Sequence, residues 1–297
     1  MKKIFKKILV LFLAIIIIVF IGINNIAPYA ILQPPRINEN IKPGNYNLRS
    51  SALNIITHDS LVLKGYFIEP KTDTAKGVVL FVHGIGGCKE HCLGLSEKLA
   101  NMGIASLVFD SRAHGKSGGK YCTYGYKEKK DVSKIVDLIK NKYPDLKIGI
   151  WGNSLGGAVA IQALEYDERI GFGIIESTFT DLDQIVFDYQ KRLSKGFGIR
   201  SISNYVLKRA GNIGSFDPKD VCPLNAVKNI EQPVLIAHGD ADKNISVKYG
   251  KLLFENLRSK NKELVIVKGG EHFGLFETGG KEYKNKVFDF IENSLKN

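Results

Sequence analysis

The pattern of apolar and polar positions divides the chain into a strongly hydrophobic N-terminus and a long region in which two kinds of segment alternate. Short continuous apolar runs, such as residues 77–83 and 170–176, are typical of strands that are buried on both faces of a sheet. Between such runs lie stretches such as 127–143, in which apolar residues recur at helical spacing. Strands that alternate with helices predict an α/β fold with a mostly parallel sheet and helices on both faces.

The same pattern gives approximate bounds for each element. Strands are expected at residues 51–58, 61–69, 77–83, 105–110, 147–152, 170–176, 233–238 and 263–268. Helices are expected at 93–102, 127–143, 155–166, 247–259 and 281–295. The alternation breaks between about 178 and 227, where helix-like pieces occur near 183–195 and 199–210. Because functional loops gather at the carboxyl ends of parallel strands, we expect this insertion to form a small helical cap over that edge.

The N-terminus is predicted to be a membrane segment. Four lysines within residues 2–7 precede an unbroken apolar run at 8–23, and no charged residue follows until Arg36. Extended to Ala27, the run has the roughly 20 residues that a helix needs to cross a bilayer core. The basic flank predicts that the N-terminus stays in the cytoplasm and that the remainder is exported.

A cleaved signal peptide is the alternative to an uncleaved anchor, and it would leave a secreted protein. It requires small residues before a cleavage site, whereas Pro28 and Tyr29 occupy those places. We therefore expect residues 1–30 to form a single-pass anchor and 31–48 a polar, proline-containing linker. Residues 49–297 then form the folded domain outside the cytoplasm, with the cap within it.

Charge and cysteine content narrow the function classes. The net charge of +12 is spread along the chain without an arginine-rich tract, so we expect solvated basic surface, with attraction to an anionic membrane, and no nucleic-acid partner. The four cysteines lack the second pair or histidine cluster that a zinc site requires. No metal and no cofactor are expected, and free or buried thiols are the default for the cysteines at positions 88, 92, 122 and 222.

Ser154 is the first candidate for chemistry, within Gly152-Asn153-Ser154-Leu155-Gly156. The motif alone is a weak signal, but it lies between an expected buried strand and an expected helix. A turn this tight admits only glycine at some positions, and it holds the serine oxygen out at the edge of the sheet. The first N–H groups of the following helix point to the same place.

A serine hydroxyl becomes a nucleophile when a base takes its proton and an acid orients that base. Both are expected in loops after later strands: His272 as the base, and Asp242, preferred to Asp240, as the acid. The order of serine, acid and histidine along the chain is the one that this architecture uses. The alternative is that His272 is an ordinary histidine in a surface loop.

An oxyanion hole is the remaining requirement, because negative charge develops on the substrate carbonyl oxygen. We expect one donor to be the backbone N–H of Leu155 and the other that of Ile85, in the glycine-rich loop after the strand at 77–83. His83, in the same loop, is expected to brace the loop by hydrogen bonding rather than to act as a base.

Taken together, these motifs resemble those of the α/β-hydrolase superfamily, from about residue 50 to the C-terminus. The resemblance is carried by His83-Gly84-Ile85-Gly86-Gly87, Asp110-Ser111-Arg112-Ala113-His114-Gly115-Lys116-Ser117-Gly118, Gly152-Asn153-Ser154-Leu155-Gly156-Gly157, His238-Gly239-Asp240-Ala241-Asp242 and Gly270-Glu271-His272. The chain looks most similar to the bacterial branch of serine aminopeptidase-like and dienelactone-hydrolase-like esterases and lipases. The resemblance implies an α/β-hydrolase fold and a structural loop at 110–118, whose Asp110 and His114 are not catalytic. The chain departs from the family in having Asn244-Ile245-Ser246 where a valine–proline pair often follows the acid.

The expected function is hydrolysis of an ester, thioester or amide through an acyl-enzyme on Ser154, most simply by a membrane-anchored carboxylesterase. The expected partners are a small-molecule or lipid-like acyl substrate and the membrane bound by the N-terminal helix; the sequence leaves the oligomeric state open. Acyl transfer or aminopeptidase activity would use the same triad. A membrane-tethered binding protein that keeps the fold without turnover is the alternative from another class. The cap, which mixes aromatic and basic residues, is either an ordinary amphipathic element or a lid that contacts the membrane or an acidic substrate.

Overall fold

Eight strands form one sheet in the order β1-β2-β4-β3-β5-β6-β7-β8 in the computed structural model, which describes residues 2–296. Met1 and Asn297, the outermost residues of the expected anchor and domain, lie outside the described residues. The strands are β1 (Ser50–Ile56), β2 (Val62–Ile68), β3 (Val78–Val82), β4 (Ala105–Phe109), β5 (Ile148–Asn153), β6 (Ile170–Glu176), β7 (Val234–Gly239) and β8 (Lys262–Val267). β2 pairs antiparallel with β1 and β4, and the other pairs are parallel. The expected mostly parallel sheet is confirmed.

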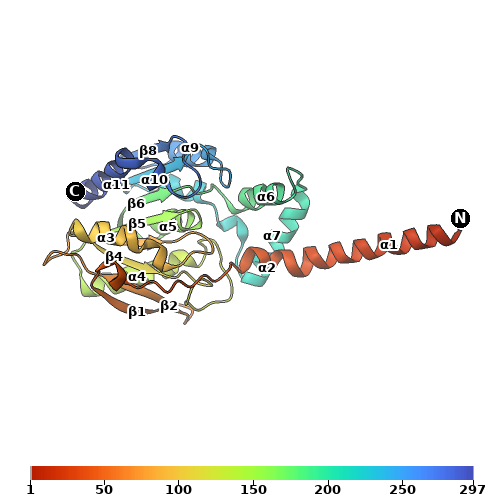
Figure 1. The fold of residues 1–297 in the computed structure, drawn as a ribbon, viewed down its shortest axis with the longest axis horizontal. Helices are drawn as coiled ribbons and strands as arrows, with labels where there is room; N and C mark the ends of the chain where they lie inside the picture. The colour runs from red at the N-terminus through yellow and green to blue at the C-terminus, as the bar shows by residue number, and fades with distance from the viewer. Residues whose placement is uncertain (1, 297) are drawn as a thin grey trace.

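Helices cover both faces of this sheet (Figure 1). The longer ones in the domain are α3 (Leu93–Asn101), α4 (Glu128–Lys142), α5 (Leu155–Tyr166), α9 (Val247–Asn256) and α11 (Gly280–Lys296). In β3, Val79 and Phe81 pack into the core beneath α3 and α11, whereas Leu80 packs into the core beneath α4, α5 and α9. Burial on both faces explains why β3 is a continuous apolar run rather than an alternating one.

One helix is shorter than its pattern indicates. The helix expected at 247–259 ends at Asn256, because Leu257 adopts an extended conformation with φ −65° and ψ 122°. Leu257 is buried, and the N–H of Arg258 donates to the carbonyl of Val227. The chain thus leaves the helix to dock on the neighbouring segment before it enters β8.

The insertion after β6 contains two long helices, α6 (Leu182–Leu193) and α7 (Arg200–Gly214). Asp181 begins α6 as an N-cap, with its carboxylate accepting from the N–H of Gln184. The two helices project from the domain on the side from which the N-terminal helix extends (Figure 1). Short helices α8 (Pro223–Ala226) and η5 (Val227–Asn229) return the chain to β7.

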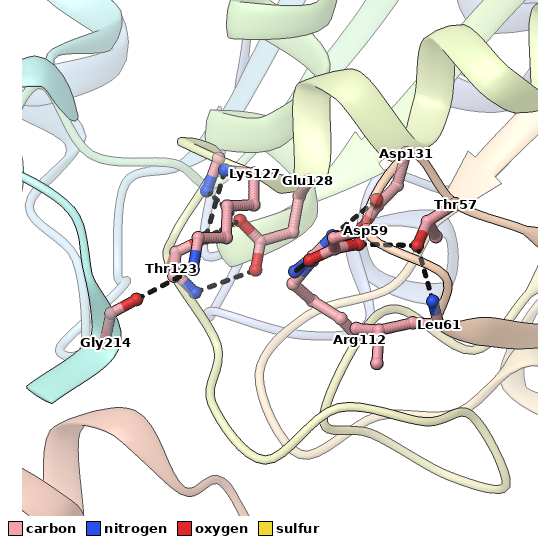
Figure 2. A network of polar contacts seen from close by, with 10 residues as sticks. Thr57, Asp59, Leu61, Arg112, Thr123, Lys127, Glu128, Asp131 and Gly214 are labelled. Atoms are coloured by element: carbon pink, nitrogen blue, oxygen red, sulfur yellow. Dashed lines mark hydrogen bonds and ion pairs between the residues drawn. The ribbon is translucent and has the colours of Figure 1, made fainter.

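A buried polar network holds the loop after β4 to its surroundings (Figure 2). The Arg112 guanidinium donates to both carboxylate oxygens of Asp131 on α4, at 2.7 and 2.6 Å, and also to Asp59 in the β1–β2 turn. Burial raises the pKa of Asp131 to about 7, against the lowering effect of its hydrogen bonds from Arg112. Asp59, Asp131 and His58 lie close enough together for a metal site, but both carboxylates are already paired with the Arg112 guanidinium.

A second set of polar contacts, at the start of α4, reaches the cap. Glu128 at the start of α4 accepts from the N–H and hydroxyl of Thr123 and from the N–H of Gly125. Next to it, Lys127 donates through Nζ to the carbonyl of Gly214, the last residue of α7 (Figure 2). This ammonium satisfies an otherwise unpaired carbonyl at the helix C-terminus, so α7 is fixed to the domain at that end.

The N-terminal segment is helical from Lys2 to Leu32 and consists of α1 (Lys2–Ile21), the π-helix η1 (Gly22–Ile26) and α2 (Ala27–Leu32). α1 extends away from the domain and leaves its apolar side chains exposed (Figure 1). Residues Lys3–Leu32 are long and apolar enough to cross a membrane, a property that anchors and signal sequences share. After α2, the Arg36 side chain donates to the carbonyls of Ser117 and Gly119.

Candidate active site

Ser154 lies at the turn between β5 and α5, with φ 56° and ψ −120°. This conformation is uncommon for a residue with a side chain and stores backbone strain. The flanking glycines make it possible: a Cβ at Gly152 would lie 2.1 Å from the carbonyl oxygen of Gly156, and one at Gly156 would lie 1.9 Å from that of Val82. The N–H of Ser154 donates to Glu176 on β6, which ties the turn to the neighbouring strand.

The three side chains expected to form a triad lie in contact. His272 Nε2 is 3.0 Å from the Oγ of Ser154, and His272 Nδ1 is 2.8 Å from Oδ2 of Asp242. The residues come from the ends of β5, β7 and β8, which the parallel sheet brings to one edge. All three side chains are buried, so solvent weakens these hydrogen bonds little. Such a chain can move a proton from the hydroxyl to the imidazole and stabilise the imidazolium.

The Asp242 carboxylate is held in its charged form. Oδ1 accepts from the N–H groups of Asn244 and Ile245, at 2.7 and 2.9 Å. Burial by itself would raise the pKa of Asp242, but hydrogen bonds from His238, His272 and Ile245 outweigh burial and hold the pKa well below its usual range. The Asn244-Ile245-Ser246 departure from the family pattern therefore leaves the carboxylate with two backbone donors. Asp240, the alternative acid, accepts instead from Gly269 at an exposed position.

His238 is a residue at this site that sequence reasoning did not single out. It is fully buried at the end of β7, and its Nε2 lies 2.9 Å from the carbonyl of Ile245 and 3.3 Å from Oδ2 of Asp242. Because Nε2 faces two acceptors, it carries the proton and donates to them. His238 thus positions the Asp242 loop. The signal in the sequence was a histidine at the last core position of a buried strand, four residues before the acid.

Two backbone N–H groups lie beside Ser154 without a protein acceptor among the described residues: those of Ile85 and Leu155. Both residues line the cavity that Ser154 lines. Gly84 brings the first loop close, since a Cβ there would lie 3.4 Å from the Cβ of Ser154. Unpaired donors at a helix N-terminus and in a close loop are suited to an oxyanion.

His83 braces this loop. Its Nε2 accepts from the N–H of Ser111 at 3.0 Å, so Nδ1 carries the proton and donates to the carbonyl of Gly84 at 2.8 Å. Burial and the nearby His114 lower the pKa of His83 to about 4, which keeps the ring neutral. Both nitrogens are engaged within the scaffold, so the ring serves the loop and not Ser154.

Asp110 and His114 also serve the scaffold. The Asp110 carboxylate accepts from the N–H and Nζ of Lys89 and from the N–H of Lys116. His114 Nδ1 lies 2.9 Å from the carbonyl of Arg112. The loop at 110–118 is thus held by its own polar groups. The four cysteine thiols are free.

A cavity of about 470 Å³ opens from Ser154. Three parts of the chain enclose it: the loops around Ser154, the cap helices α6 and α7, and the end of the N-terminal helix. Most of the residues that line it are aliphatic or aromatic. Its size and apolar character are those of a small-molecule binding site.

Known proteins are similar to this chain in sequence. Residues 73–209 match a family described as serine aminopeptidase, S33. The chain is 30% identical over 237 residues to YqkD of Bacillus subtilis, which covers 78% of this chain and 75% of that protein. It is also 30% identical over 257 residues to human monoglyceride lipase, covering 74% of this chain and 82% of the lipase.

The chain belongs to the α/β-hydrolase superfamily. A solved structure, that of the Pyrococcus furiosus esterase Pf2001, aligns with a TM-score of 0.74 and 28% identity over 89% of this chain and 98% of the esterase. The expected fold class is thereby confirmed. The homologous esterases and lipases show that the chain is a hydrolase.

The strained turn gives the first testable prediction. Replacing Gly156 with alanine should lower the free energy of unfolding by about 3 kcal/mol, because the new Cβ would overlap the carbonyl of Val82. Urea unfolding of the detergent-solubilised protein, followed by the fluorescence of Trp151, measures the change. Gly94→Ala in α3, where nothing but one ring atom of Tyr46 at 3.9 Å is near, is the matched control. It should change stability by less than about 1 kcal/mol. Equal stability of the two variants would contradict the steric account.

Proposed function

We propose that the chain is a membrane-anchored serine hydrolase that cleaves a carboxylic ester through an acyl-enzyme on Ser154. The observation that carries this is the hydrogen-bonded series from Ser154 through His272 to Asp242, at the wall of an apolar cavity. In this proposal, the Ser154 oxygen attacks the substrate carbonyl while Nε2 of His272 takes the hydroxyl proton. The N–H groups of Ile85 and Leu155 bind the oxyanion.

Two transfers complete the cycle. His272 returns the proton to the leaving alcohol as the tetrahedral intermediate collapses, and the acyl group remains on Ser154. Water then gives a proton to His272 and attacks the acyl-enzyme. As this second tetrahedral intermediate collapses, His272 returns the proton to the Ser154 oxygen, which restores the hydroxyl and releases the carboxylic acid. Asp242 stabilises the imidazolium in both halves, and its charge is secured by the two backbone donors and by His238.

A lipid-like acyl ester is the substrate class that the cavity supports best. Its walls include Phe179, Ile185 and Val206, side chains that offer dispersion contacts and no charge. The relation to human monoglyceride lipase points the same way. The family description names an aminopeptidase, so hydrolysis of an amide is tested alongside hydrolysis of an ester.

The nucleophile is tested by replacing Ser154 with alanine. The wild-type protein should be labelled by a fluorophosphonate probe and should hydrolyse p-nitrophenyl esters, and the variant should do neither, because it lacks the hydroxyl that contacts His272. A parallel assay with aminoacyl p-nitroanilides separates esterase from peptidase. Persistent labelling of the variant would refute the assignment. An unlabelled wild-type protein without turnover would instead favour a ligand-binding role.

The acid is tested with a matched pair. Asp242→Asn should lower kcat about ten-thousand-fold, because an amide that donates to Nδ1 would leave the proton on Nε2, where it blocks the base. Asp240→Asn, two residues away on the same loop, should leave kcat within about threefold, because the Asp240 carboxylate accepts from Gly269 at an exposed position. Steady-state hydrolysis of p-nitrophenyl butyrate measures both. Larger damage from the Asp240 variant would move the acid to that residue.

α1 is the proposed membrane anchor. Its large apolar side chains are between 45% and 68% exposed and cover all sides of the helix, a pattern that water does not tolerate but a bilayer does. Lys3, Lys6 and Lys7 lie at the end that would face the cytoplasm. The catalytic domain would then lie outside the membrane on its own tether.

The topology is tested by inserting a specific protease site after Asn38, which is exposed between the anchor and the domain. Protease added outside intact spheroplasts should cut the chain at the inserted site, seen as a shift on a denaturing gel, because residues 39–297 lie outside the membrane in this proposal. A cytoplasmic marker protein carrying the same cleavage site should remain uncut until the cells are permeabilised. Protection of the inserted site would reverse the orientation. A domain that is soluble before protease is added would show a cleaved signal sequence.

A further inference from the structure

The end of the N-terminal helix forms part of the cavity at Ser154. Ile23 of η1 and Ala27, Ala30 and Ile31 of α2 line the same space as Ser154. Ile23, Ala27 and Ala30 belong to the segment expected to form the anchor, and Ile31 is the first residue of the expected linker. A simple tether would leave the active site complete without it, whereas here the tether supplies a wall of the site.

The helix is irregular at this point, and the backbone carbonyl that this irregularity leaves free bonds to the cap. Pro28 has no N–H and cannot bond to the carbonyl four residues earlier, that of Asn24. The helix widens there into the π-helix η1, with the N–H of Ala27 donating to Gly22. Arg209 of α7 donates to the freed Asn24 carbonyl at 3.3 Å, and Tyr205 donates to the Asn24 side chain at 2.6 Å.

α2 is fixed to the domain as firmly. Leu32 is fully buried in the main core, and its carbonyl accepts from the N–H of Cys122 at 2.8 Å. The hydroxyl of Tyr124 donates to the carbonyl of Ile31 at 2.7 Å, and Tyr124 itself lines the cavity. The wall made by residues 22–32 is therefore held in place by backbone hydrogen bonds and core packing.

The cavity reaches the surface close to the cap tip. Leu193, the last residue of α6, lines the cavity and is 83% exposed. The α6 and α7 helices lie on the side of the domain from which α1 extends (Figure 1). An acyl chain bound along the cavity would thus run from Ser154 between the cap helices and the end of the anchor.

We propose that residues 22–32 are the acyl-binding wall of the active site, and that Ile23, Ala27, Ala30 and Ile31 determine which acyl chains the enzyme accepts. This inference rests on the proposed ester hydrolysis at Ser154. It also requires that the working enzyme keep its N-terminal segment. Cleavage near residue 30 would remove Ile23 and Ala27 from the wall and would release the Asn24 contacts with α7.

Two isoleucines in η1 provide a matched test in the full-length protein. Ile23 lines the cavity, whereas Ile26, which also lies in η1, is 64% exposed and does not line the cavity. Ile23→Trp should lower the ratio of kcat/KM for p-nitrophenyl laurate to that for p-nitrophenyl acetate by at least about tenfold, since added bulk shortens the space for the chain. Ile26→Trp should leave this ratio unchanged.

A milder variant guards against misfolding. Ala27→Leu adds three carbons to the same wall and should shift the ratio in the same direction as Ile23→Trp. Fluorophosphonate labelling of each variant reports whether the Ser154 site is intact. Equal ratios for wild type and both wall variants, with labelling retained, would overturn the proposal. Equal losses in the Ile23 and Ile26 variants would also overturn it, because the effect would then not come from the cavity.

A binding measurement separates this inference from the proposed function. In a Ser154→Ala background, Ile23→Trp should weaken the binding of a long-chain fatty acid at least about tenfold by titration calorimetry, whereas Ile26→Trp should leave the affinity unchanged. That result would support the acyl-binding wall even if the wild-type protein showed no esterase activity. Equal affinity in both variants would contradict the wall even in an active esterase.

Discussion

The close approach of β5 and α5 at Ser154 is the constraint on which the rest of the site depends. The turn places Gly152 and Gly156 so near to other backbone atoms that no side chain fits at either position. The strain at Ser154 is offset by burial of α5 against the sheet and by the bond from Ser154 to β6. In return, the hydroxyl and the N–H of Leu155 are presented at the same edge of the sheet. Each other component of the site, from loops after β3, β7 and β8, is arranged around that fixed point.

Buried polar groups keep those loops in position. His83 links the β3 loop to Ser111, and His238 links the end of β7 to Asp242 and Ile245 in the following loop. Arg112 does the same on a larger scale for the loop after β4 (Figure 2). Such interactions add little net stability, but an unpaired group in the same place would be costly. They therefore favour one arrangement of loops over its alternatives.

The cavity joins three parts of the molecule. The domain supplies Ser154, the cap supplies α6 and α7, and the apolar N-terminal helix supplies the remaining wall. Lys127 and Arg209 fasten the cap helix α7 to the domain and to the anchor, respectively. A helix that lies in a bilayer and also borders the site would bring an acyl ester and the nucleophile together without passage through water.

The sequence by itself determined the order of strands and helices along the chain, because the local pattern of apolar residues indicates how each element is buried. It also brought Ser154, Asp242 and His272 forward as candidates, because strand ends and glycine-rich turns are local signals. It predicted that the helix ending at Asn256 would continue to residue 259, since the position of that end depends on docking against Val227. It gave no role to His238, whose importance comes from a contact with a loop. Above all, only the tertiary structure decided that Ile23 and Ala27 border the same cavity as Ser154. An apolar run indicates that a helix avoids water, but which surface it meets is settled by contacts between distant residues, here with Tyr124, Tyr205 and Arg209.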